Sequence, residues 1–306
     1  MKTSKKLWTL AGVGLLILGL LLCAVALAAS GGFMGFADMN IPSYNTNTYE
    51  ITEDFKNIDI DEIESDVIFL PSSDGKCKIT ATESEEIYNE IKVVGDTLTV
   101  TRKDAREWYK KIGFVWWGDI TLTVYLPEHE YGELLIKTVS GDIDLSHGFT
   151  FLTANVSSTS GDIDFPCSAS EGLTINTTSG NINLKDVTVN AEATVKSVSG
   201  DIYLRSVNAY SLSLKTTSGD IEAASAIISG KLHAKSTSGD VEISASDAAL
   251  AEIRTTSGDV ECEFLTPKNI TTDTSSGDIR VPSSIPASSS CQIKTTSGDI
   301  KVTYKN

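Results

Sequence analysis

The sequence predicts an all-β protein, a right-handed parallel β-helix (solenoid) of about 19–20 residues per coil that follows one amino-terminal transmembrane helix. Three observations lead to this prediction. A tetrapeptide close to Ser-Gly-Asp-Ile recurs at a nearly constant interval, apolar and polar residues alternate around each copy, and a long uncharged apolar run lies near the amino terminus. The right hand is expected because crossovers between parallel strands wind that way.

The uncharged run makes residues 7–29 a transmembrane anchor. Its 23 residues would form a helix of about 34 Å, enough for a bilayer core of about 30 Å. Residues 1–6 carry three lysines and no acid, so the positive-inside rule keeps them in the cytoplasm. We therefore expect a single-pass cell-membrane protein that contacts the lipid bilayer through residues 7–29, with an extracytoplasmic carboxy-terminal domain.

A cleaved signal peptide is the alternative to this anchor, because Ala26-Leu27-Ala28 matches the small-residue cleavage pattern. The apolar run is longer than the usual signal core of about 7–15 residues, which favours retention. The small and polar residues 30–48 are predicted to form a linker.

Residues 49–131 are expected to form an irregular β cap and the first coils, since solenoid ends need atypical segments that cover open strand edges. The expected strands are 58–60, 67–70, 78–81, 97–100 and 120–127.

Residues 132–306 contain nine copies of the repeat, whose glycines are 19 to 21 residues apart. The glycines are Gly141, Gly161, Gly180, Gly200, Gly219, Gly239, Gly258, Gly277 and Gly298. Two and four residues after each glycine the side chain is apolar, and five and seven residues before it nearly always so. Each copy thus predicts a strand before the glycine, a corner, and a strand after it, with coils stacked at about 4.8 Å.

Polar positions recur with the same register. Three residues before each glycine stands Ser or Thr on the face predicted to be buried, which indicates an internal hydroxyl ladder that bonds the next coil or the backbone. Its members are Thr138, Ser158, Thr177, Ser197, Thr216, Ser236, Thr255, Thr274 and Thr295. Outward basic residues four positions before the glycine, and outward acids three positions after it, predict one basic and one acidic stripe.

An aspartate follows almost every repeat glycine and has two interpretations. In the first, the glycine takes a positive φ and the carboxylate bonds a nearby backbone N–H in the turn. In the second, the stacked carboxylates bind cations such as Ca²⁺, although the G-G-x-G-x-D signature of calcium solenoids is missing. The aspartates are Asp142, Asp162, Asp201, Asp220, Asp240, Asp259, Asp278 and Asp299, with Asn181 completing the row.

Aromatic residues gather in the cap at Trp108, Tyr109, Phe114, Trp116 and Trp117, which makes this cluster the candidate ligand-binding site. Such side chains suit sugars and membrane interfaces, and they also suit the inside of a cap.

Composition excludes several classes of function. The 306 residues include 25 Lys and Arg against 41 Asp and Glu, a net charge of -16, so no nucleic-acid partner is expected. The sequence leaves open whether Cys77, Cys167, Cys262 and Cys291 form disulfides. No catalytic motif is present and the regular intervals leave no long loop to build a cleft, so we expect no enzyme and no cofactor. A polysaccharide-active β-helix enzyme is the minor alternative.

The anchor, Leu126-Pro127 and the Ser-Gly-Asp-Ile copies together resemble the bacterial putative-adhesin family of unknown function (DUF4097 type), which includes LiaG-like membrane proteins of Gram-positive envelope-stress operons. The resemblance covers roughly residues 50–306. It implies an exported, non-enzymatic envelope protein and supplies no catalytic or binding residues. We expect an adhesin-like surface binding module, with cell-wall glycan or another envelope protein as partner. The alternative is a regulatory or scaffold partner of a membrane sensor or transporter.

Overall fold

The computed structural model describes residues 19, 21, 43–107, 120–283 and 286–305. The chain divides into a unit of residues 1–43, of which three are described, and a unit of residues 44–306. All named elements in the described residues are β-strands. Within this part of the chain no helix has the length and apolar character needed to cross a membrane. The anchor expected at residues 7–29 lies outside the described residues, apart from Gly19 and Leu21.

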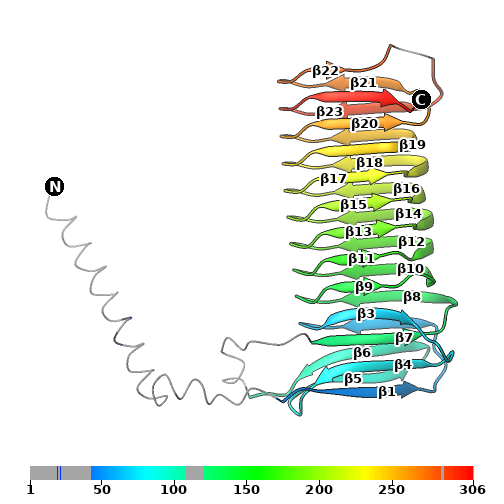
Figure 1. The fold of residues 1–306 in the computed structure, drawn as a ribbon, viewed down its shortest axis with the longest axis vertical. Coiled ribbons are helices and arrows are strands. Elements are labelled where there is room, and N and C mark those ends of the chain that lie inside the picture. Colours follow the sequence, from blue (N-terminus) through cyan, green and yellow to red (C-terminus); the bar gives the residue numbers. More distant parts are fainter. Residues whose placement is uncertain (1–18, 20, 22–42, 108–119, 284–285, 306) are drawn as a thin grey trace. The chain divides into compact units, whose positions relative to one another are not determined.

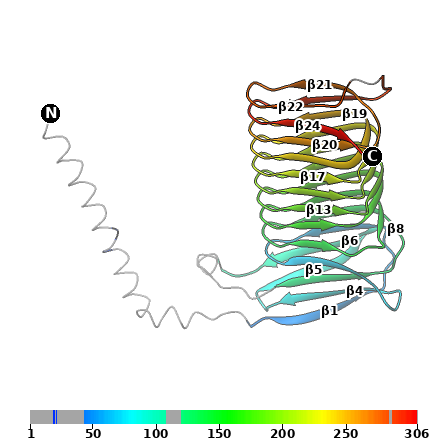
Figure 2. The ribbon, with the colours of Figure 1, turned by 45° about the horizontal axis from the view of Figure 1, so that its top comes forward.

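The second unit is a β-solenoid in which each coil gives one strand to each of two parallel sheets (Figures 1 and 2). We call them the pre-glycine sheet and the post-glycine sheet, after the strand's position in the repeat. The pre-glycine sheet stacks β8 (Glu130–Lys137), β10 (Thr150–Ser157), β12 (Ser168–Asn176), β14 (Thr188–Lys196), β16 (Asn208–Lys215), β18 (Ile227–Lys235) and the second half of β19 (Val241–Arg254). The post-glycine sheet stacks β9 (Ile143–Leu145), β11 (Ile163–Phe165), β13 (Ile182–Lys185), β15 (Ile202–Arg205), β17 (Ile221–Ala224), the first half of β19, and β20 (Val260–Phe264).

The core lies between the two sheets and is built from the apolar positions of the repeat. Equivalent residues pair in register, so that Ile182 lies between Ile163 and Ile202 in the post-glycine sheet. In the pre-glycine sheet, Val195 lies between Ile175 and Leu214. All these side chains are buried, which confirms the alternation read from the sequence and the strand on each side of the glycine.

The carboxy-terminal coils do not stack in chain order. They comprise β21 (Asn269–Asp273), β22 (Ile279–Arg280), β23 (Ser290–Lys294) and β24 (Ile300–Tyr304). β23 pairs with both β19 and β21, and β24 pairs with both β20 and β22. The last copy of the repeat therefore lies inside the stack, and the copy before it forms the end (Figure 1).

Hydrophobicity accounts for this exchange. The end copy has Thr272 where other copies have an apolar residue, and its Ile279 is 45% exposed. In the last copy the equivalent residues, Ile293 and Ile300, are fully buried. The more apolar copy occupies the position that is covered on both sides, because burial of apolar surface stabilises the fold.

The amino-terminal end contains a tenth coil that the repeat pattern did not predict. It is formed by β2 (Asn57–Asp61) and β3 (Asp66–Pro71), which pair with β8 and β9. Ser65 takes the place of the glycine, and Asp66 and Val67 follow it. This coil lies between strands that come later in the chain, whereas the carboxy-terminal copy lies between strands that come earlier.

Beyond this coil lie β6 (Thr97–Asp104) and β7 (Thr121–Leu126), and then the antiparallel strands β1 (Asn45–Ile51), β4 (Cys77–Glu83) and β5 (Ile87–Val94). The five stretches expected as strands in residues 49–131 fall in β2, β3, β4, β6 and β7. The sequence analysis did not identify β1 and β5, and β1 begins within the stretch 30–48 that was expected to be a linker.

The expected positive φ at the repeat glycines is wrong at seven of nine positions, since only Gly277 and Gly298 adopt it. The glycines are needed for a different reason. A Cβ atom on Gly200 would lie 1.8 Å from the carbonyl oxygen of Gly180 in the neighbouring coil. The coils approach so closely at this corner that no larger residue fits without displacing the backbone.

Candidate functional site

The aspartate row is a chain of hydrogen bonds between coils. In each coil the backbone N–H of the aspartate donates to the side-chain oxygen of the aspartate on the adjacent coil, at 2.7–2.9 Å. Asn181 accepts the N–H of Asp201 through its amide oxygen. The series begins at Asp66 of the tenth coil, which accepts the N–H of Asp142. Each side-chain oxygen therefore accepts a backbone N–H of the adjacent coil. The first interpretation, in which it accepts an N–H in the turn of its own coil, is wrong.

The second interpretation of this row was a cation ladder. The described residues contain no group of three or more His, Cys, Asp or Glu side chains placed to hold a metal ion. One oxygen of every ladder aspartate except Asp278, which ends the stack, already accepts a backbone N–H, and this accounts for the residue type without a cation.

The predicted hydroxyl ladder is confirmed. Ser197 is buried, its Oγ donates to the carbonyl oxygen of Gly180 at 3.1 Å, and it accepts the N–H of Gly200 at 2.8 Å. Thr216 and Ser236 donate to the glycine carbonyl of the preceding coil in the same way. These bonds satisfy polar backbone groups that the close glycine contact would otherwise bury without partners.

The aromatic cluster of Trp108, Tyr109, Phe114, Trp116 and Trp117 lies outside the described residues. The chain leaves the described part after Glu107, close to the end of β6, and re-enters it at Ile120. The cluster therefore stays a prediction as a binding site.

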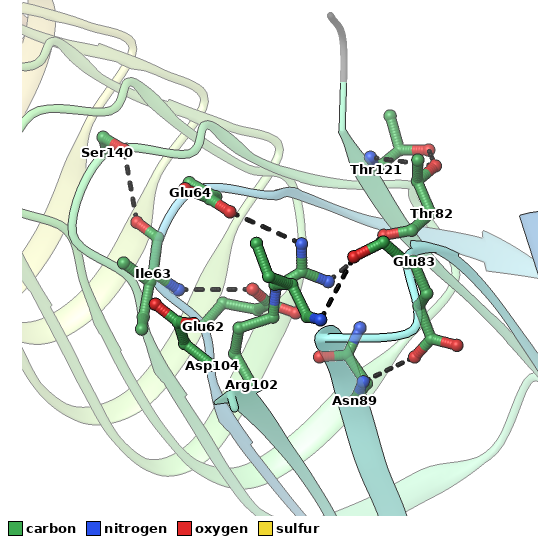
Figure 3. A network of polar contacts seen from close by, with 12 residues as sticks. Glu62, Ile63, Glu64, Thr82, Glu83, Asn89, Arg102, Asp104, Thr121 and Ser140 are labelled. Carbon is green, nitrogen blue, oxygen red and sulfur yellow. Dashed lines mark hydrogen bonds and ion pairs between the residues drawn. The ribbon is translucent and has the colours of Figure 1, made fainter. Parts of the chain in front are cut away.

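Arg102 on β6 lies in a buried polar network at the amino-terminal end (Figure 3). Its guanidinium donates to the Thr82 carbonyl at 3.1 Å and approaches the Glu64 carboxylate at 3.5 Å. Burial raises the pKa of Glu62, and the charge of Arg102 partly offsets this effect. Glu62 occupies the hydroxyl-ladder position of the tenth coil, and its Oε1 has no hydrogen-bond partner among the described residues.

The cysteines whose pairing the sequence left open are free thiols. Cys77, Cys167, Cys262 and Cys291 are all buried and none forms a disulfide. Burial raises the pKa of Cys77, Cys167 and Cys291 to about 12. Protonated thiols inside the core are unreactive, so they act as small apolar side chains.

A groove of about 310 Å³ runs along the outer face of the post-glycine sheet, across β13, β15, β17 and β19. It lies between two rows of outward side chains, and the strand backbones at Leu184, Leu204 and Ala223 line its floor. One row contains Asn183, Tyr203, Glu222 and Glu242, and the other contains Lys185, Arg205, Ala224 and Ser244. Register pairing places the members of each row on successive coils.

The expected stripes only partly describe these surfaces. In the basic stripe Lys196, Lys215 and Lys235 do follow one another in register on the pre-glycine sheet. The acidic stripe is interrupted, because Asn183 and Tyr203 stand between Asp164 and Glu222. This interruption, beside the two cations, distinguishes the groove from the rest of the face.

Tyr203 has a fixed orientation in the groove wall. Its hydroxyl donates to the Asp201 carboxylate at 2.8 Å, and this bond, together with burial and nearby carboxylates, raises the pKa of Tyr203 to about 12. Burial raises the pKa of Glu222, and the carboxylates of Glu242 and Asp220 add to the effect. The sequence analysis placed Glu222 and Glu242 in the acidic stripe and passed over Lys185, Tyr203 and Arg205. Comparing the third and fifth positions after the glycine across copies would have revealed the set.

Comparison with known proteins identifies relatives by fold. Residues 55–303 match the model of the Toastrack DUF4097 family. The crystal structure of a putative adhesin from Bacteroides fragilis is 16% identical, with a TM-score of 0.44, covering 85% of this chain and 97% of that chain. A putative lipid binding protein from Parabacteroides distasonis is 17% identical, with a TM-score of 0.49 and coverage of 86% and 97%. A putative adhesin from Parabacteroides merdae is 17% identical, with a TM-score of 0.45 and the same coverage. Curated proteins give no match.

Proposed function

Because the chain belongs to the Toastrack DUF4097 family, a fold whose outer faces are long arrays of stacked side chains, we propose that it is a membrane-anchored, extracytoplasmic binding module of the cell envelope. Residues 7–29 hold it in the bilayer, residues 1–6 remain in the cytoplasm, and the right-handed solenoid faces outward. The module acts without catalysis, and its target is cell-wall glycan or another envelope component.

The observation that carries this proposal is the groove on the post-glycine sheet. Its charged side chains are Lys185, Arg205, Glu222 and Glu242, and none of them forms a side-chain hydrogen bond or ion pair within the described residues. A groove that concentrates unpaired charges is suited to bind a ligand, because each charge retains its full capacity for a partner.

Co-sedimentation tests the proposal. The full chain is inserted in nanodiscs and mixed with isolated Gram-positive cell walls, with empty nanodiscs as the control. We expect the protein to pellet with the walls, and replacement of Trp116 and Trp117 by Ala measures the contribution of the aromatic cluster. Failure to pellet with walls, combined with binding to protein-containing membranes and not to protein-free vesicles, would replace this proposal by a regulatory partner of a membrane protein.

A further inference from the structure

The groove on the post-glycine sheet carries opposite charges on its two halves. On β13 and β15, Lys185 and Arg205 stand opposite one another in register, which makes this half cationic. On β17 and β19, Glu222 and Glu242 are register partners, which makes the other half anionic. The lining is therefore neutral in sum and strongly dipolar along the direction of the stack.

Each half brings like charges together, and no side chain of opposite charge pairs with them among the described residues. The coils are about 4.8 Å apart, so each pair of like charges lies on adjacent strands. Next along the acidic row, Glu261 forms an ion pair with Lys301, whereas Glu222 and Glu242 have no such partner within the described residues. Neighbouring like charges favour a ligand that supplies the missing counter-charges.

The dimensions indicate what kind of ligand fits. The midpoints of the two halves are two coil spacings apart along the stack, about 10 Å, and the two rows are offset by two residues along the strand, about 7 Å, so the midpoints are about 12 Å apart. An extended peptide advances about 3.3 Å per residue, so the terminal charges of a tripeptide are about 10 Å apart, and the long side chains of Lys185 and Arg205 can span the remainder. A groove of about 310 Å³ is at the small end of ligand pockets, which agrees with a ligand of this size.

We propose that the groove binds an extended zwitterion of about tripeptide length. Its ammonium group lies between Glu222 and Glu242, and its carboxylate lies between Lys185 and Arg205. The ring of Tyr203, held toward Asp201, forms the wall at the point where the charge changes sign. This inference rests on the proposed function, since it names the ligand class of the same groove.

Titration calorimetry with tri-alanine tests the assignment on the full chain in nanodiscs. We expect wild-type protein to bind tri-alanine, and N-acetyl-tri-alanine and tri-alanine amide each to bind about tenfold more weakly, because each blocks one charged contact. The double variant Glu222→Gln, Glu242→Gln should lose the discrimination against the acetylated peptide and keep that against the amide. Arg205→Gln should show the reverse. Asp164→Asn, in the same row but outside the groove, should bind as wild type does.

Circular dichroism is used to check that each variant is folded. All four charged positions are at the surface. Equal binding of the free, acetylated and amidated peptides, or no binding of tri-alanine to wild type, would overturn the inference. The same preparations are used for wall co-sedimentation. Wild-type protein that pellets with walls and ignores tri-alanine contradicts the ligand class alone, and protein that binds tri-alanine without pelleting contradicts the proposed wall target alone.

Discussion

The ammonium group of Lys268 is buried against the carboxylate of Asp247, which lies 21 residues earlier in the chain. The Lys268 side chain is 1% exposed, and it also donates to the Ala248 carbonyl at 2.8 Å and to the hydroxyls of Thr266 and Ser289. These bonds tie the segment that leads into the end coil to β19 and to the segment that leads into β23.

Replacement of Lys268 by Met should therefore destabilise the protein by about 3–5 kcal/mol, because it removes one partner of a buried ion pair and leaves the other without a counter-charge. Urea unfolding followed by circular dichroism measures the loss. Lys294→Met is the matched control, since the Lys294–Asp273 pair is more than half exposed and should contribute less than about 1 kcal/mol. Equal losses in the two variants would show that burial of the Lys268 pair is unimportant.

Replacement of Gly200 by Ala should destabilise the solenoid by about 3 kcal/mol, because the added Cβ would collide with the Gly180 carbonyl oxygen. Gly172 on β12 is the control. A Cβ there would have its nearest contact at 3.8 Å, to the Glu192 carbonyl oxygen, and its φ is not positive. Gly172→Ala should be neutral or slightly stabilising, and a similar loss at both sites in urea unfolding would refute the close-contact explanation.

Replacement of Asp220 by Asn should leave the free energy of unfolding within about 0.5 kcal/mol of wild type, because the amide oxygen can still accept the Asp240 N–H. Asn181 plays this role in the native chain. Asp220→Ala removes the acceptor and should cost about 1–2 kcal/mol.

Thermal melts of wild type and Asp220→Asn with and without Ca²⁺ test the cation ladder, at about 1 mM, which is on the order of the dissociation constants of extracellular calcium sites. A melting temperature that rises with Ca²⁺ in wild type and not in Asp220→Asn would revive the cation ladder.

Replacement of Glu62 by Gln should stabilise the protein more as the pH rises. Burial raises the pKa of Glu62 above its ordinary value of 4.5, so the folded state binds its proton more tightly than the unfolded state does. Below the unfolded pKa both states are protonated and the variant should match wild type. As the pH rises through the folded pKa, wild type loses stability relative to the variant. Urea unfolding across this range measures the difference, and a difference that does not change with pH would exclude the carboxylate charge as its cause.

The repeat pattern predicted most of the core, because period-two alternation at fixed distances from each glycine specifies which side chains face inward. Ile182, Val195 and Ser197 lie where that pattern puts them. The tenth coil was not predicted because Ser65 replaces the glycine, although Ile58, Ile60, Val67 and Phe69 keep the apolar spacing. The groove was not predicted because its charged residues belong to two rows, and neither row contains all four charges.

The amino-acid sequence was enough to predict the β-solenoid, the two sheets and the family, because these follow from local alternation repeated at a constant interval. It did not determine which coil stacks on which. Every copy offers the same strands and the same corner, so local pattern permits any copy as neighbour. In the folded protein the order follows from burial, which places the copy with Ile293 and Ile300 inside the stack and the copy with Thr272 at the end. The need for glycine at the corners also arises only in the stack, because the distance between adjacent coils is a property of the packed coils and not of any single turn.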